Sequence, residues 1–145
     1  MFRIANIEEI NERYSRKLGN QVIIDVSDFI KKNISSEYIF IRYMGPKFVI
    51  VFSGVSTDSV IDFITNIQTN AEKMQISLVE NFQEVNLEES VKKTAKKKEK
   101  PQQVSPKLNF VVTTYYKGTG MEEVLKKLEQ YLDSCDKNEH SITSI

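Results

Sequence analysis

The sequence is poor in the residues and patterns that mark several protein classes. It contains one cysteine, Cys135, and one histidine, His140, which excludes an internal disulfide and any metal centre built from spaced cysteine or histidine pairs. Its 20 basic residues balance its 20 acidic residues, so no overall field attracts nucleic acid or anionic lipid. No apolar run approaches the roughly 20 residues of a membrane-spanning helix, and no signal peptide is evident. We therefore expect a cytoplasmic location, no membrane insertion by this segment and no nucleic-acid partner.

The remaining composition favours one packed core. The chain has 145 residues, of which 40% are hydrophobic, and this is enough for one sizeable core. Runs of β-branched and aromatic residues predict strands, and apolar residues at helical spacing predict helices. The expected strands cover residues 2–6, 38–43, 48–52, 76–79 and 109–116, and the expected helices cover residues 7–18, 22–30, 60–74 and 121–135. This order predicts an α/β fold with a central, mostly antiparallel sheet packed by helices.

The domain organisation follows from where these patterns stop. We expect a single domain over residues 1–135, interrupted by a lysine-rich loop insertion at residues 80–107. Lysines crowd residues 92–100 without interleaved aromatics, which is the composition of a solvated loop more than of a nucleic-acid site. Residues 136–145 are polar and are expected to form a frayed tail.

Two motifs stand at a distinctive spacing. The first is INERYSRKLGN at residues 10–20, and the second is RYMGPKF at residues 42–48, which contains a Gly-Pro turn between two predicted strands. This region resembles the signature of GGDEF domains, which runs approximately FKxINDxYGHxxGD and continues, about two dozen residues later, to RYGGDEF. Five residues then occupy the signature positions without a gap: Met44, Gly45, Pro46, Lys47 and Phe48.

The resemblance implies a nucleotide-cyclase-like, palm-type fold and a place in bacterial cyclic di-GMP signalling. Within the family, the sequence resembles a degenerate member. Active members join two GTP molecules across a homodimer and use carboxylates to hold two divalent ions. The metal-binding aspartate of the first strand falls on Arg3, and the two signature acids fall on Pro46 and Lys47. Divalent ions of this kind need oxygen ligands. We therefore expect no metal, no cofactor and no enzymatic activity.

The resemblance also implies that part of the family's nucleotide-binding site is retained. Asn11 falls on the asparagine that reads guanine, whereas Asn20 replaces the aspartate that pairs with the guanine edge. The phosphate-binding lysine and arginine near the end of the last helix fall approximately on Asp136 and His140. Asn11 and Asn20 are therefore the remnant nucleotide-binding candidates.

Two functions from different classes follow. The first is a catalytically inactive regulatory or protein-interaction module, whose partner is the rest of a larger signalling protein, another protein or a second copy. The alternative is a receptor for GTP or cyclic di-GMP that uses Asn11, Asn20 and a basic pocket of Arg3, Lys47 and Lys117. The same three basic residues could instead lie exposed on a solvated rim. An active cyclase or hydrolase would need metal ligands that the signature no longer offers.

Overall fold

The sheet has β1 (Phe2–Ile4) at its centre. The computed structural model describes residues 1–78 and 102–145. Its main sheet has the order β2 (Ile39–Met44), β3 (Lys47–Val51), β1, β6 (Leu108–Val112) and β7 (Ser141–Ser144). All pairs are antiparallel except β6 and β7, which run parallel. The expected α/β fold with a mostly antiparallel sheet is confirmed.

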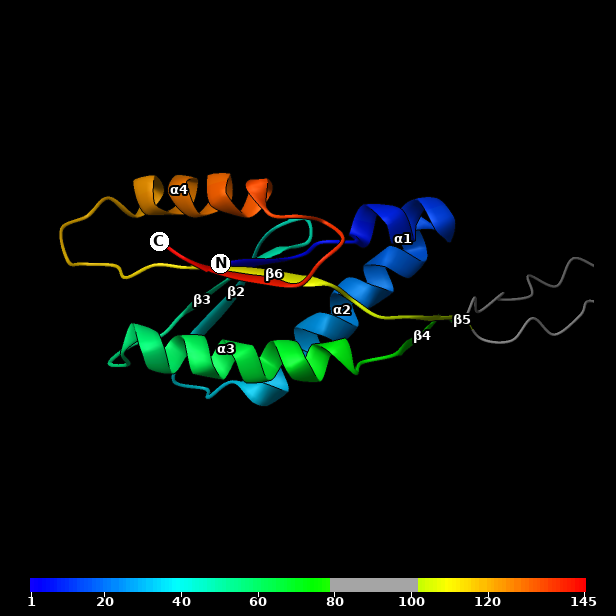
Figure 1. Cartoon of the computed structure of the whole chain (residues 1–145), viewed down its shortest axis with the longest axis horizontal. Helices are drawn as coiled ribbons and strands as arrows, with labels where there is room; N and C mark the ends of the chain where they lie inside the picture. Colours follow the sequence, from blue (N-terminus) through cyan, green and yellow to red (C-terminus); the bar gives the residue numbers. More distant parts are fainter. Residues whose placement is uncertain (79–101) are drawn as a thin grey trace, which may run out of the picture.

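Helices cover both faces of the sheet and bury two clusters of side chains. α4 (Met121–Ser134) lies on one face, and α3 (Thr57–Glu72) lies on the other (Figure 1). α1 (Ile7–Arg13) and α2 (Arg16–Asn33) pack with α3 into the larger cluster. In that cluster Phe2 stacks between Phe48 and Phe110, with ring centroids 5.0 Å from each. Since β1 is buried on both faces, its short FRI sequence can still hold the centre of the sheet.

The break between the first two helices differs from the prediction. The first helix was expected to continue to Leu18 and the second to begin at Val22, but α1 ends at Arg13 and α2 begins at Arg16. Ser15 is the N-cap of α2, and its hydroxyl accepts a hydrogen bond from the Leu18 amide at 3.2 Å. Because the Ser15 hydroxyl satisfies a free amide of the first turn, the helix begins at Arg16, and Gly19 lies within its first turns rather than at a break.

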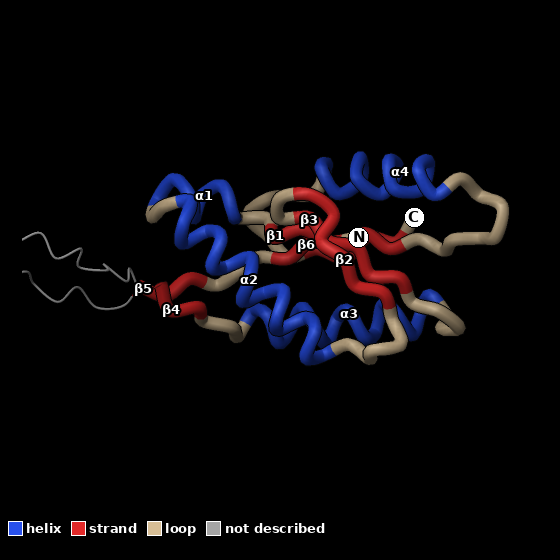
Figure 2. The backbone as a smooth tube through the Cα atoms, turned by 180° about the vertical axis from the view of Figure 1, so that it is seen from behind, coloured by secondary structure: helices blue, strands red, loops and turns tan. Residues whose placement is uncertain are grey.

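Three strands also differ from the prediction. β1 ends at Ile4, and β6 ends at Val112, so both are shorter than expected. The predicted loop at residues 80–107 contains β5 (Gln102–Val104), which pairs with β4 (Ile76–Leu78) in a second, two-stranded sheet at one end of the molecule (Figure 2). The lysine run at residues 92–100 lies outside the described residues.

The tail that was expected to fray is ordered. Its residues Ser141–Ser144 form β7, which extends the sheet beyond β6. Ile142 packs on the larger cluster, and the backbone amide of Ile145 donates to the Val112 carbonyl at 2.9 Å. A strand with one central apolar residue gives almost no periodic signal, and this explains why the prediction was wrong.

Candidate functional site

The candidate site lies where the resemblance places metal and phosphate, between the signature hairpin and the end of α4. Arg3 on β1 and Lys47 on β3 are direct cross-strand partners. Their neighbours Phe2 and Phe48 point into the core on the α3 side, so strand alternation directs both basic side chains to the α4 side of the sheet. Two positive charges thus stand side by side in the middle of the sheet.

Arg3 is buried and fully engaged by its surroundings. Only 6% of the residue is exposed. Its Nε donates to the Asn109 side chain at 3.2 Å, and one terminal nitrogen donates to the Cys135 carbonyl at 2.8 Å. The other terminal nitrogen lies 3.6 Å from the Asp133 carboxylate. A buried guanidinium is tolerated only when its donors and charge find such partners.

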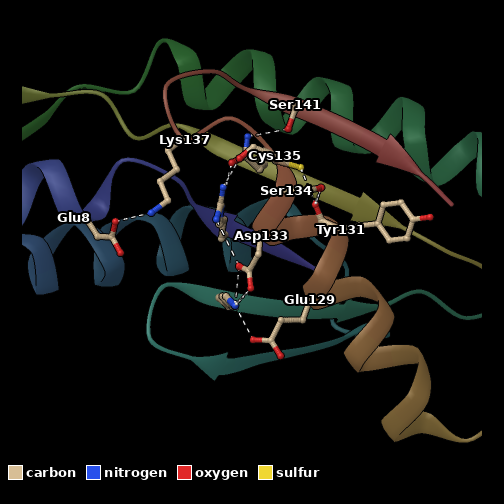
Figure 3. A network of polar contacts seen from close by, with 11 residues as sticks. Glu8, Glu129, Tyr131, Asp133, Ser134, Cys135, Lys137 and Ser141 are labelled. Carbon is tan, nitrogen blue, oxygen red and sulfur yellow. Dashed lines mark hydrogen bonds and ion pairs between the residues drawn. The ribbon is translucent and has the colours of Figure 1, made fainter.

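Lys47 is held between two carboxylates of α4. Its ammonium lies 2.6 Å from Glu129 and 3.0 Å from Asp133 (Figure 3). Burial lowers the pKa of Lys47, but hydrogen bonds and charge attraction from the two carboxylates outweigh it and hold that pKa above its ordinary value. The ammonium is therefore strongly favoured in its charged form.

The cationic side chains at the adjoining cavity are already paired with carboxylates. A cavity of about 320 Å³ opens beside Arg3, Pro46, Lys47 and Asp133. On its rim, Lys137 lies 2.7 Å from Glu8, which lowers the pKa of that carboxyl through the hydrogen bond and the charge of the lysine. The three cationic side chains of this network are thus matched by three carboxylates. An anionic phosphate entering the cavity would have to displace existing partners.

The donor set does not fit a divalent ion. Arg3 and Lys47 bring positive charge to this region, and Pro46 has no side-chain oxygen. The backbone carbonyl of Pro46 is itself an acceptor for the Ile4 amide at 3.1 Å. Within residues 1–78 and 102–145, no three His, Cys, Asp or Glu side chains gather where an ion could be held. Hard cations require such oxygens.

The signature hairpin joins β2 and β3 through a tight turn. Gly45 has φ +54°, a left-handed conformation that suits glycine at a tight turn. Its carbonyl accepts a hydrogen bond from the Arg42 side chain at 2.9 Å. Met44 is exposed at the end of β2, and Phe48 is fully buried in the core. The hairpin therefore serves as scaffold and carries one charged side chain, Lys47, into the network.

The remnant asparagines lie on neighbouring helices, away from this network. Asn20 is exposed on α2, and Asn11 on α1 is half-buried. A Cβ at Gly19 would lie 1.8 Å from the Asn11 side-chain oxygen, so the two residues are in close contact. The structure thus brings Asn11 next to Gly19, the residue that precedes Asn20.

Sequence reasoning missed Glu129 and Asp133. It placed the relevant last-helix positions at Asp136 and His140, but Asp136 caps the Asn138 amide and His140 accepts from the Leu108 amide. The four-residue spacing of the two missed acids, which places them on one side of a helix, was the available signal. Lys117 precedes the opposite end of α4, so a basic pocket of Arg3, Lys47 and Lys117 does not form. The alternative of three exposed side chains on a rim is wrong for Arg3, which is 6% exposed.

Comparisons with known proteins agree with this geometry. The model of the family described as "Diguanylate cyclase, GGDEF domain" matches residues 1–104. The crystal structure of the GGDEF domain of DgcB from Caulobacter crescentus in complex with c-di-GMP superposes with a TM-score of 0.70 at 14% identity, covering 99% of this chain and 74% of that one. A DgcB structure that includes its coiled coil gives the same TM-score and covers 66% of that chain.

Sequence relatives are longer proteins. An uncharacterised membrane protein of Staphylococcus haemolyticus is 28% identical over 75 residues, which are 52% of this chain and 21% of the relative. One from Staphylococcus aureus is 27% identical over the same shares. The chain thus spans about a fifth of their length. None of its helices in the part that the structure describes is long and apolar enough to cross a bilayer.

The motif spacing, the sheet order and the matched family model agree over most of the sequence, and this chain belongs to the GGDEF domain family.

Proposed function

We propose that this GGDEF domain is catalytically inactive and acts as a regulatory or protein-interaction module of a larger signalling protein. The observation that carries the proposal is the ion-pair network at the former metal and phosphate region. There Arg3 and Lys47 replace acids, and Glu129 and Asp133 face them from α4. An active site that clusters carboxylates around two cations would have the opposite polarity.

The network also argues against the nucleotide-receptor alternative. A triphosphate is recognised by unpaired cationic donors, whereas Lys47 is shared by two carboxylates and Arg3 is 6% exposed. Binding would have to break these pairs and desolvate new charges. Asn11 and Asn20 could still contact a base, but at the phosphate end the cationic side chains are already paired with carboxylates.

An interaction role is supported by an uncovered part of the sheet. Ile39 and Ile41 on β2 lie opposite Val51 and Val49 on β3. Val49 packs under α4, but Ile39, Ile41 and Val51 on the same face are 58%, 47% and 37% exposed. Adjacent apolar side chains in solvent are typical of a surface that another protein covers.

The test is calorimetric titration with GTP and with cyclic di-GMP, each with and without magnesium, combined with chromatographic detection of cyclic di-GMP. We expect neither turnover nor micromolar binding. Magnesium-independent binding that weakens in Asn11→Ala and Asn20→Ala, but not in the exposed control Gln21→Ala, would favour the receptor instead. Formation of cyclic di-GMP by the natural chain would refute the proposal.

A second test asks whether the lost acids alone explain inactivity. A triple variant carries Arg3→Asp, Pro46→Glu and Lys47→Glu. We expect it to remain inactive, because the new carboxylates would face Glu129 and Asp133 at close range. Measurable cyclic di-GMP from the triple variant would show that this opposition does not matter.

A further inference from the structure

β2 is an outer strand of the main sheet. Among residues 1–78 and 102–145, it pairs with β3 and with no other strand. Natural sheets usually protect such an edge with lysine, proline or an irregularity. Residues 39–42 contain neither lysine nor proline, and the irregularity in the pairing with β3 comes only after Arg42. This part of β2 therefore has the features of an edge that can accept a further strand.

Hydrogen bonding alternates along β3, and this fixes the direction of its backbone groups. The Ile4 amide donates to the Pro46 carbonyl at 3.1 Å. In the same antiparallel register Phe2 lies opposite Phe48, so the amide and carbonyl of Phe48 point toward β1. The backbone groups of the next residue, Val49, therefore point the other way, toward β2.

The same alternation identifies the backbone groups on the outer side of β2. Val49 lies opposite Ile41, so Ile41 exchanges its hydrogen bonds with β3. Phe40 and Arg42 stand on either side of Ile41 in the strand, and their amides and carbonyls point away from β3. Each chain thus presents the donors and acceptors of both residues along its outer edge.

This edge is complementary to itself. If two copies of β2 run antiparallel about a two-fold axis at Ile41, Phe40 of each copy lies opposite Arg42 of the other. Because both residues direct their backbone groups outward, this register pairs every outward amide and carbonyl of residues 40–42. An axis at Phe40 or at Arg42 would pair only one of the two residues with outward groups of β2.

The side chains of β2 fit the same register. Ile41 meets Ile41 of the second copy at the axis, and Ile39 lies opposite Tyr43. All three residues are exposed in the single chain, and cross-strand pairs of apolar and aromatic residues stabilise antiparallel strands. Each Arg42 lies opposite Phe40 and not opposite the other Arg42, so like charges do not face each other directly.

We propose that two copies of this domain associate through β2 and form one continuous sheet. The proposal rests on the interaction role proposed above and identifies the partner as a second copy of the chain. The contact uses backbone groups and exposed side chains of β2 and involves neither Arg3 nor Lys47, so it requires no nucleotide and no metal. A contact along one short strand is small, and we therefore expect a dissociation constant of about 10–100 μM.

Sedimentation velocity of the whole chain between about 5 and 500 μM tests the association. We expect a shift from monomer to dimer that is unchanged by GTP or cyclic di-GMP. Ile41→Lys places two ammonium groups opposite each other and should weaken association at least about tenfold. Ile24→Lys is the matched control, because Ile24 is 51% exposed on α2 and lies outside β2. Circular dichroism verifies that both variants are folded.

Cysteine cross-linking tests the register. In a Cys135→Ser background, Ile41→Cys should form a disulfide-linked dimer on mild oxidation. Opposite residues of a non-hydrogen-bonded pair have Cα atoms about 4.5 Å apart, which is within the range of a disulfide. Val51→Cys is the control, since Val51 is exposed on the same face but lies one strand farther from the axis, on β3. It should not cross-link.

The proposal has several outcomes that would overturn it. They are a chain that stays monomeric at about 500 μM, equal association of Ile41→Lys and Ile24→Lys, equal cross-linking of Ile41→Cys and Val51→Cys, and dimers that form only with cyclic di-GMP. None of them would restore catalysis, which the assay for cyclic di-GMP formation tests separately. Failure of the dimer can thus be distinguished from failure of the proposed function.

Discussion

Replacing Lys47 by methionine removes the ammonium at the centre of the network while keeping a side chain of similar length. A hydrogen bond to a charged group contributes about 1.5–3 kcal/mol when shielded, and partly exposed pairs contribute less. The side chains of Lys47 and Glu129 are 15% and 26% exposed. We therefore expect Lys47→Met to lower the free energy of unfolding by about 1–2 kcal/mol.

The two carboxylates should contribute unequally. Glu129 is 2.6 Å from the ammonium, whereas Asp133 is 3.0 Å away and its side chain is 54% exposed. In double-mutant cycles with Glu129→Gln and Asp133→Asn, we expect a coupling of about 1 kcal/mol for Glu129 and at most about 0.5 kcal/mol for Asp133. Because the pKa of Lys47 is raised, this stabilisation is complete at neutral pH and is lost as the pH rises through the folded-state value above 10.5.

Urea unfolding followed by circular dichroism measures each free energy. Lys127→Met, which changes an exposed lysine of α4, is the control and should have little effect. In about 1 M salt, where charges are screened within roughly 3 Å, the coupling to Asp133 should fall more than the coupling to Glu129. A coupling to Glu129 that cannot be distinguished from zero would refute the electrostatic account of this site.

Two further predictions concern packing and pH. Gly19→Ala should destabilise the domain by about 1–3 kcal/mol, because the new Cβ would lie 1.8 Å from the Asn11 oxygen. In an Asn11→Ala background the same change should instead stabilise α2 by up to about 1 kcal/mol. Urea unfolding of the natural chain, the two single variants and the double variant measures both effects, and equal effects in the two backgrounds would contradict the prediction. Because burial lowers the pKa of the His140 imidazole below its ordinary value of 6.5, the contribution of this residue to stability should be complete at alkaline pH and decline as the pH falls through 6.5, where the unfolded chain takes up the proton first. His140→Gln should remove this part of the pH dependence in urea unfolding curves, and an unchanged pH dependence in that variant would count against a buried imidazole.

Features that depend on neighbouring residues could be predicted from the sequence. The hairpin followed from its Gly-Pro turn. The helix expected at residues 60–74 forms as α3, which Ser56 caps by accepting a hydrogen bond from the Ser59 amide at 3.2 Å. The helical stripes at residues 7–18 and 22–30 correspond to α1 and α2, which are adjacent in the chain and pack on each other. Such features need only local chemistry and periodicity.

Features that depend on distant partners could not be predicted. Lys47 meets Glu129 across 82 residues of chain and Asp133 across 86, and neither contact leaves a pattern within either segment. β7 has one central apolar residue and gains its stability from pairing with β6. Short polar strands at a sheet edge are defined by their neighbour more than by their own sequence.

The charge pairing between the sheet and α4 bears on how this domain could change over time. An acid introduced alone at position 3 or 47 would place a negative charge against Asp133 or Glu129. A base introduced alone at position 129 or 133 would instead face Arg3 or Lys47. Each of these single changes loses an attraction and creates a repulsion. Reversing the sign of one side of the network without such a repulsion therefore requires coordinated changes on separate elements.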